Sequence, residues 1–132
     1  LPARQVEMAE AMAADFVVVA VPGSPATHHL IDAKALGMMK KTGIFVNISR
    51  GDVVDETALI DALQQGRIAG AGLDVYEFEP KVPVALMAME NVTLLPHLGT
   101  ACLEVREDMG MMAVANLVAW AEGKTPPNLV NP

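Results

Sequence analysis

Apolar runs that alternate with helical patterns are the feature of this sequence that most constrains its fold. The run FVVVAV, residues 16–21, precedes a helical pattern, and the same order returns at GIFVNIS and IAGAGLDV. Continuous runs of this length are typical of strands buried on both faces of a parallel sheet. Strands that alternate with helices build such sheets through right-handed crossovers. The sequence therefore predicts an α/β fold that is part of a doubly wound parallel sheet.

The same patterns give approximate bounds for each element. Strands are predicted at residues 15–22, 43–49, 68–75 and 92–96. Helices are predicted at residues 3–14, 32–41, 55–66 and 101–122. Asp32 and Asp55 stand where N-caps are expected, and Gly66 and Gly123 stand where helices should stop. The segment KVPVALMAME, residues 81–90, is interpreted as a loop.

Composition excludes several classes of protein. A chain of 132 residues with 52% hydrophobic residues can form a compact domain with a core. Its net charge of -7 argues against nucleic acid as a partner. Its longest apolar runs are shorter than the roughly 20 residues that a membrane span requires, so no membrane partner is expected. The single cysteine, Cys102, favours a reducing compartment, and we predict a cytoplasmic protein.

Polar side chains follow the predicted strands where each strand ends. The second strand runs into Arg50, the third into Asp74 with Glu77 and Glu79 nearby, and the fourth into His97. The carboxyl ends of parallel strands meet at one edge of a sheet, which is where α/β proteins bind ligands. An arginine, several carboxylates and a histidine should therefore converge on one site.

Each of these residues also has a simpler interpretation. An arginine after a strand is often a surface residue, and a histidine beside a proline is often structural. The acidic stretch YEFEP is typical of a solvated loop. The neighbours His28 and His29 have no partner at metal-ligand spacing, so we interpret them as an exposed loop and predict no metal site.

Three motifs in order, VNISRGDVVDE, AGLDVYEFEP and LLPHLGTA, resemble the D-2-hydroxyacid dehydrogenase family. The branch that they resemble most is the glyoxylate/hydroxypyruvate reductases. The resemblance implies a Rossmann-type fold, NAD or NADP as cofactor, a small 2-oxo or 2-hydroxy acid as substrate, and a homodimer. It leaves open which 2-oxo acid is reduced and which of the two cofactors is used.

The resemblance also implies roles for individual residues. Arg50 would bind the substrate carboxylate, His97 would be the acid/base, and Glu79 would pair with that histidine. Asp74 would contact the nicotinamide side of the cofactor. The residues that would line the cofactor are Val21, Pro22, Ser24, Thr27, Ile48, Ser49, Asp74, His97, Gly99 and Thr100.

Elementary chemistry agrees with the three catalytic roles. A guanidinium fork matches the planar carboxylate of a 2-oxo acid and aims its carbonyl carbon at the cofactor. An imidazolium can supply the proton that the carbonyl oxygen needs as hydride arrives. A carboxylate on the far ring nitrogen holds the imidazole and favours its charged form.

The dinucleotide fingerprint GxGxxG does not occur in this sequence. In the family that it resembles, the fingerprint lies before the point at which this chain begins. We therefore expect residues 1–123 to be the C-terminal portion of the NAD(P)-binding domain. Residues 124–132 would be a tail that leads back toward a substrate domain outside this chain.

Three alternatives remain from the sequence. The first is another dehydrogenase of the family, of the phosphoglycerate or D-lactate type. The second is a corepressor-like binding protein that keeps this fold. The third is a phosphotransfer receiver domain, which the sequence disfavours because the first strand lacks the acidic pair that this class needs and ends at Val21, Pro22 and Gly23.

Overall fold

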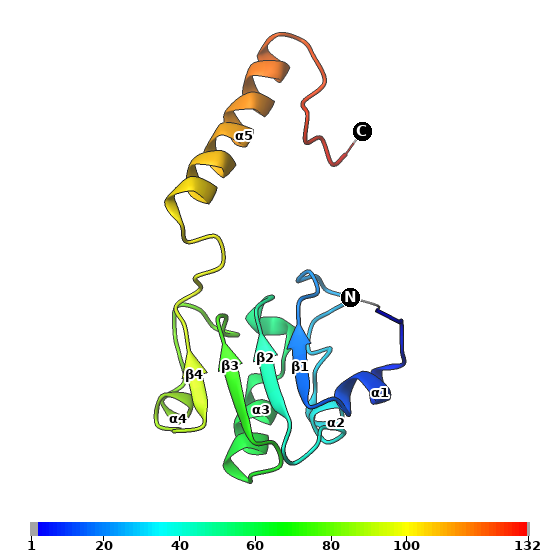
Figure 1. The fold of residues 1–132 in the computed structure, drawn as a ribbon. Coiled ribbons are helices and arrows are strands. Elements are labelled where there is room, and N and C mark those ends of the chain that lie inside the picture. The colour runs from blue at the N-terminus through cyan, green and yellow to red at the C-terminus, as the bar shows by residue number, and fades with distance from the viewer. Residues whose placement is uncertain (1–2, 132) are drawn as a thin grey trace. The chain divides into compact units, whose positions relative to one another are not determined.

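Four parallel strands form one sheet in the order β1-β2-β3-β4 (Figure 1). The computed structural model describes residues 3–131 and contains two units, Leu1–His97 and Leu98–Pro132. The sheet belongs to the first unit and consists of β1 (Phe16–Val19), β2 (Ile44–Asn47), β3 (Gly70–Leu73) and β4 (Val92–Leu94). The predicted α/β fold with a parallel sheet is confirmed.

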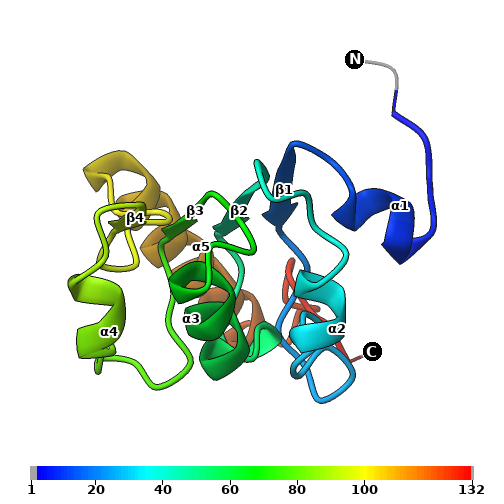
Figure 2. The same cartoon turned by 90° about the horizontal axis from the view of Figure 1, so that it is seen from below.

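Helices α2 (Ala33–Leu36), α3 (Glu56–Gln64) and α4 (Val84–Met87) lie on one side of the row of strands (Figure 2). A short helix, α1 (Met8–Met12), precedes β1. The core lies between the sheet and these helices, and its most deeply buried members include Phe45, Leu36, Leu59, Ile68 and Leu86. Because the strands are parallel, their carboxyl ends and the loops that follow them lie together at one edge of the sheet.

The predicted helix caps are confirmed. The amide of Ala35 donates to Asp32 Oδ1 at 2.8 Å, and the amide of Ala58 donates to Asp55 Oδ1 at 2.9 Å. These bonds satisfy amides that the first turn of a helix leaves without partners. Gly66 follows α3 with φ of 60°, a backbone conformation that glycine adopts without strain.

Other element predictions were wrong. The expected helix over residues 3–14 is limited to α1, because Glu7 at its N-cap is extended and makes no side-chain cap bond. The expected loop over residues 81–90 contains α4, whose four residues are too few to show helical periodicity. A 3₁₀ turn, η1 (Gly51–Val53), was also not predicted.

The burial predicted for β1 is also wrong within the first unit. Val17 and Val19 are buried, but Phe16 is 69% exposed and Val18 is 55% exposed. Side chains alternate between the faces of a strand, and α2 and α3 cover only one face of the sheet. β1 is also the strand at one end of the sheet order, with β2 as its strand neighbour.

The second unit contains one long helix, α5 (Leu103–Ala121), close to the predicted range 101–122. Gly123 follows it with φ of 70°, as expected for a helix stop. α5 has no buried side chain, and its exposed apolar residues include Leu103, Met111, Leu117 and Trp120. Within residues 3–131, no helix combines the length and apolar character that crossing a membrane requires.

Candidate active site

Asn47, the last residue of β2, positions the segment that carries Arg50. Its side chain is buried, with a residue exposure of 2%. Asn47 Nδ2 donates to the carbonyl oxygen of Arg50 at 3.0 Å, and Asn47 Oδ1 accepts from the amide of Ser49 at 3.0 Å. One buried carboxamide thus folds the chain back on itself directly after the strand. This residue was not predicted, and an asparagine that ends an apolar run was the only signal for it.

Two glycines allow close packing of the loops near Arg50. A Cβ atom at Gly23 would lie 2.8 Å from Arg50 Cγ, so only a residue without a side chain fits beside the arginine stem. A Cβ atom at Gly51 would lie 1.9 Å from the carbonyl carbon and oxygen of Tyr76. The Arg50 guanidinium donates from Nη1 to the carbonyl oxygen of Ser49 at 2.7 Å. The loops after β1, β2 and β3 are therefore packed together around Arg50.

A cavity of about 450 Å³ lies at the carboxyl ends of β1 and β2. Its lining consists of residues 20–23 and 48–50, which include Val21, Pro22, Ile48 and Ser49 from the predicted cofactor set. The Ser49 hydroxyl donates to the carbonyl oxygen of Val21 and joins the two loops. The structure thus brings four predicted cofactor residues together with Arg50.

Ser24, Thr27 and Asp74 are further members of the predicted cofactor set at this edge of the first unit. The Thr27 hydroxyl donates to the carbonyl oxygen of Pro22 at 2.9 Å and accepts from the amide of Ser24 at 2.9 Å. It therefore folds the loop after β1. Asp74 follows β3 directly, is 8% exposed, and donates its amide to the carbonyl oxygen of Asn47 at 3.0 Å.

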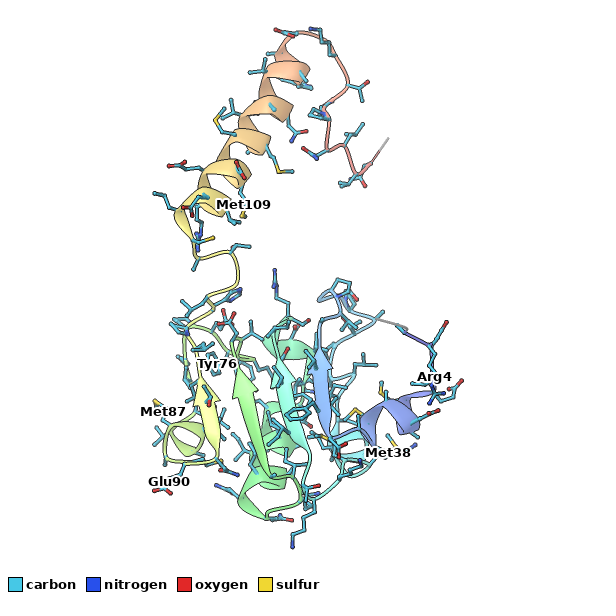
Figure 3. All side chains as sticks on the ribbon, in the orientation of Figure 1. Arg4, Met38, Tyr76, Met87, Glu90 and Met109 are labelled. Atoms are coloured by element: carbon cyan, nitrogen blue, oxygen red, sulfur yellow. The ribbon has the colours of Figure 1, made fainter. Side chains whose placement is uncertain are left out.

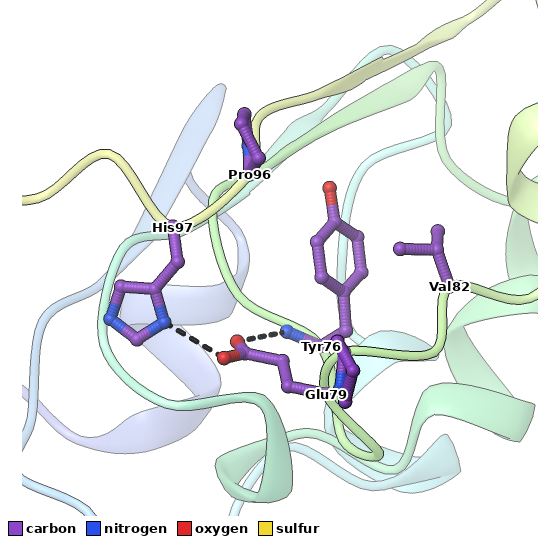
Figure 4. Close-up of a pocket in the computed structure, with 6 residues that line it drawn as sticks. Tyr76, Glu79, Val82, Pro96 and His97 are labelled. Atoms are coloured by element: carbon purple, nitrogen blue, oxygen red, sulfur yellow. Dashed lines mark hydrogen bonds and ion pairs between the residues drawn. The ribbon is translucent and has the colours of Figure 1, made fainter.

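His97 and Glu79 form a hydrogen-bonded pair (Figure 4). His97 Nδ1 lies 2.9 Å from Glu79 Oε2, and Glu79 Oε1 accepts from the amide of Tyr76 at 3.0 Å. His97 has φ of 55°, a left-handed conformation that is uncommon for residues other than glycine and clusters at functional sites. Nε2 of His97 is the ring nitrogen that this pair leaves for a substrate.

A second cavity, of about 420 Å³, lies beside this pair. Its lining residues are Tyr76, Glu79, Pro80, Val82, Pro96 and His97. Tyr76 lies at the carboxyl end of β3 (Figure 3), and its hydroxyl donates to the carbonyl oxygen of Leu95 at 2.8 Å. The tyrosine thus ties the loop after β3 to the residue that follows β4.

The surroundings of Glu79 keep its carboxyl group charged. Burial alone would raise the pKa of Glu79, but the hydrogen bonds from His97 and from the Tyr76 amide lower it. The charges of His97 and Arg50 lower the pKa further, and the net shift is downward. Glu79 is therefore an acceptor for the His97 ring at neutral pH, and the charge of Arg50 acts on the same carboxylate.

The prediction that His28 and His29 form an exposed loop was wrong for His29, which is half-buried and pairs with a glutamate. His29 Nε2 lies 2.8 Å from Glu77 Oε1, and the side chains are 35% and 12% exposed. The YEFEP stretch was also more than a solvated loop, since Glu77 and Glu79 each hold a histidine. Within residues 3–131, no group of three or more His, Cys, Asp or Glu side chains could hold a metal ion.

Gly99 and Thr100, the remaining predicted cofactor residues, belong to the second unit. Thr100 has φ of 66°, and its carbonyl oxygen accepts from Arg106 Nε at 3.2 Å at the start of α5. Their contact with a cofactor stays a prediction.

Comparison with known proteins identifies the family. The model of the D-isomer specific 2-hydroxyacid dehydrogenase, NAD binding domain, matches residues 1–99. This chain belongs to that family. The resemblance seen in the three motifs is confirmed, and the receiver-domain alternative is wrong.

Relatives with curated names lie within the same family. The glyoxylate reductase of Pyrococcus horikoshii is 51% identical over 117 residues, which are 89% of this chain and 35% of that protein. The glyoxylate/hydroxypyruvate reductase B of Escherichia fergusonii is 51% identical over 120 residues, which are 90% of this chain and 37% of that protein. The chain thus spans about a third of the length of these relatives.

A solved relative has the same fold. The NADPH-dependent glyoxylate/hydroxypyruvate reductase of Sinorhizobium meliloti, in complex with NADP and malonate, superposes with a TM-score of 0.83 at 46% identity. The superposition covers 86% of this chain and 35% of that chain.

Proposed function

We propose that this chain supplies the catalytic residues and part of the cofactor site of a reductase that converts glyoxylate or hydroxypyruvate to the 2-hydroxy acid with NADH or NADPH. The observation that carries the proposal is the His97–Glu79 pair, with its 2.9 Å hydrogen bond. It lies at a sheet edge where the charge of Arg50 also lowers the pKa of Glu79. The names of the curated relatives support the same substrates.

The residues at the carboxyl ends of β1 and β2 fit a nicotinamide cofactor. The cavity of about 450 Å³ is lined by small and apolar residues and by loop backbone from residues 20–23 and 48–50. Such crevices at strand ends are where α/β sheets bind dinucleotides. The candidate contacts are Val21, Pro22, Ser24, Thr27, Ile48, Ser49, Asp74, His97, Gly99 and Thr100. When bound, NADH or NADPH supplies the hydride for the reaction.

Arg50 binds the substrate carboxylate in this mechanism. A guanidinium offers two parallel N–H groups to a carboxylate, which fixes the plane of the substrate as well as its position. Asn47 holds the Arg50 backbone and Gly23 packs against the arginine stem, so the fork is aimed before the substrate arrives. Such orientation is a large part of what a catalyst of hydride transfer contributes.

His97 donates the proton. Its Nδ1–H donates to Glu79, so a protonated ring presents Nε2–H to the carbonyl oxygen of the substrate. As hydride adds to the carbonyl carbon, the proton moves from Nε2 to that oxygen, giving the hydroxyl group and leaving a neutral imidazole. Glu79 keeps the ring in the required tautomer and stabilises its charged form.

The organisation of the whole protein is part of the proposal. Residues 1–123 would be the C-terminal portion of the NAD(P)-binding domain, and residues 124–132 would lead toward a substrate domain. The family model over residues 1–99 supports the first assignment. The enzyme would be cytoplasmic. It would also be a homodimer, which size-exclusion chromatography with light scattering can test.

A hybrid enzyme tests the activity. In this hybrid, the chain replaces the matching segment of the Pyrococcus horikoshii glyoxylate reductase, whose remaining length supplies the rest of the fold. We expect NADH- or NADPH-dependent reduction of glyoxylate or hydroxypyruvate, measured by loss of cofactor absorbance, with the parent reductase as positive control.

The same assay separates the alternatives. Higher kcat/KM with pyruvate or a phosphorylated 2-oxo acid would favour a D-lactate or phosphoglycerate type of dehydrogenase. A folded hybrid that binds cofactor but turns over no 2-oxo acid would favour a corepressor-like binding protein.

A further inference from the structure

A second histidine–glutamate pair lies beside the candidate active site and is not used by the proposed reaction. It joins His29, in the loop after β1, to Glu77, in the loop after β3, at 2.8 Å. The other oxygen of Glu77, Oε2, accepts from the amide of Glu56, the first residue of α3, at 3.2 Å. One carboxylate therefore holds segments that follow three different strands.

Glu56 returns the bond to Glu77. Its Oε2 accepts from the amide of Glu77 at 3.3 Å, and the residue is 7% exposed. Each glutamate thus binds the backbone amide of the other, although 21 residues separate them. A carboxylate that accepts from a backbone amide in this way fixes the path of both segments, because leaving a partly buried amide without a partner is costly.

His29 is held in an uncommon backbone conformation. Its φ is 49°, so it shares the left-handed region with His97. Its amide donates to the carbonyl oxygen of Asp52, within η1, at 2.9 Å, and its ring stacks on His28 with centroids 4.0 Å apart. Such conformations persist where the surroundings over-determine them, which the bonds to Asp52 and Glu77 do here.

The segments that these residues join carry the two halves of the candidate active site. Arg50 and Gly51 precede Glu56 in one segment, and Tyr76 and Glu79 flank Glu77 in the other. Gly51 packs directly on the Tyr76 carbonyl group, where a Cβ atom would lie 1.9 Å away. A shift of Glu77 would therefore move the surface against which the Arg50 segment rests.

We propose that His29, Glu77 and Glu56 form a loop clamp that positions Arg50 relative to the His97–Glu79 pair. The inference rests on the proposed function for its kinetic readout and on the hydrogen bonds above for its geometry. The three are positioning residues, since none of them touches the substrate or the reacting atoms in the proposed mechanism.

The surroundings of the clamp raise the pKa values of His29 and Glu56. The hydrogen bond that His29 donates to Glu77 raises the pKa of His29 above 6.5 despite the opposing effect of burial, and the charges of Glu77, Asp55 and Asp52 raise it further. Burial raises the pKa of Glu56 above 4.5, as does the charge of Glu77, against the lowering effect of the backbone hydrogen bond. A charged His29 offsets the repulsion between the two glutamates.

The sign of the pH dependence follows. Because the pKa of His29 is raised in the fold, its charged interaction with Glu77 is fully present at low pH and is lost as pH rises through that pKa. The clamp should hold Arg50 best in mildly acidic solution and more weakly in basic solution.

His29→Gln in the hybrid enzyme is the central test. Glutamine keeps a neutral donor but carries no charge. We expect the KM for glyoxylate to rise about tenfold near pH 6 and to differ from that of the parent hybrid by less than about twofold near pH 9. The dissociation constant for NADPH should stay within about twofold. The other residues are common to both enzymes, so the ratio of their KM values isolates His29.

Glu77→Gln provides the partner variant. It should raise the KM for glyoxylate, and adding His29→Gln to it should cause little further change, because the two residues act as one unit. The matched control is Glu90→Gln. Glu90 is exposed and lies at the opposite end of the strands (Figure 3), so this control should leave the KM unchanged.

Two outcomes would overturn the clamp. One is a KM ratio between His29→Gln and the parent hybrid that does not change with pH. The other is a loss of activity through kcat alone at constant KM, which is what a smaller folded fraction would give. Should the parent hybrid show no reductase activity, the proposed function fails and NMR of the hybrid decides the clamp separately. Glu77→Gln should then shift both the His29 ring signals and the Arg50 amide, and an unchanged Arg50 amide would exclude the clamp.

Discussion

Arg50 owes its position to contacts made by its backbone and its stem. Asn47 binds its carbonyl oxygen, and the bare Cα of Gly23 lies against its side-chain carbons. The guanidinium itself donates from Nη1 to the carbonyl oxygen of Ser49 at 2.7 Å. An arginine whose backbone and side-chain stem are fixed, and whose guanidinium carries further N–H donors, suits the binding of an anion.

Arg50→Lys should separate a bidentate fork from a point charge. In the hybrid enzyme, we expect a higher KM for glyoxylate and a lower kcat, with a combined loss of about 1–3 kcal/mol in transition-state stabilisation. Steady-state kinetics measures the change. Arg67→Lys, the same substitution at an exposed arginine, is the control. Kinetics of Arg50→Lys that match the parent hybrid would exclude Arg50 as the carboxylate ligand.

Glu79→Gln should change the pH dependence of the reaction. The charged carboxylate stabilises the protonated ring of His97, so its loss should move the upper pH limit of glyoxylate reduction to lower pH. Rate profiles of the variant and of the Glu90→Gln control measure this shift. Profiles of Glu79→Gln and of the parent hybrid that superimpose would show that the pair is not coupled.

The same variant has a consequence for stability. Because the pKa of Glu79 is lowered from 4.5 in the fold, its contribution is present above that ordinary value and is lost as pH falls through the folded pKa. The difference in unfolding free energy between the parent chain and Glu79→Gln should therefore be largest at neutral pH and shrink in acid. Urea unfolding at several pH values tests the direction.

Sequence reasoning reached Arg50, Glu79 and His97 because each stands in a motif, directly after or close to a strand. It did not reach the pair of His29 with Glu77, whose members are 48 residues apart. A histidine in a loop and a glutamate in an acidic stretch each look solvated on their own. Only the fold brings the loops after β1 and β3 together, so this pair could not be predicted from the sequence.

At the level of elements, local signals predicted the boundaries of α3 and α5 and the start of α2, whereas α2 ends at Leu36 rather than near residue 41. Asp32 and Asp55 predicted the starts of α2 and α3 because a side-chain oxygen that caps an amide is a local interaction. The helix α4 escaped prediction because one turn has no period to detect, and Pro83 at its N-cap makes no side-chain cap bond. The strands were predicted longer than they are, since β pairing ends where the neighbouring strand ends.

Gly51→Ala tests the close approach between η1 and the loop after β3. A methyl group there would meet backbone atoms of Tyr76 at 1.9 Å, and backbone cannot rotate away as a side chain can. We expect a loss of about 1–3 kcal/mol in unfolding free energy, together with weaker glyoxylate binding by the hybrid. Gly72→Ala is the control, because its Cβ would meet only Val46 Cγ2 at 3.9 Å. Equal stability of the two variants would contradict the tight packing.

The whole chain exposes an unusual amount of apolar surface in each of its units. In the first, β1 has β2 as its strand neighbour and presents Phe16 and Val18 to solvent. In the second, α5 buries no side chain, and Trp120 is 74% exposed. Exposed apolar faces of this kind mark surfaces that pack against other protein, and an open strand edge invites association. The chain also lacks the glycine-rich turn whose amides would hold a pyrophosphate.

We therefore expect the 132-residue chain on its own to self-associate, to bind neither NADH nor NADPH tightly, and to reduce no glyoxylate. The hybrid, in which the relative contributes the other two thirds of its length, should be dispersed and active. Light scattering reports the association state, and calorimetry with each cofactor reports the binding. Phe16→Ser, on the exposed face of β1, should reduce self-association of the isolated chain, whereas Lys41→Ser, an exposed position in the turn before β2, should not. Micromolar binding of either cofactor by a soluble monomer would show that residues 1–132 already hold a complete cofactor site.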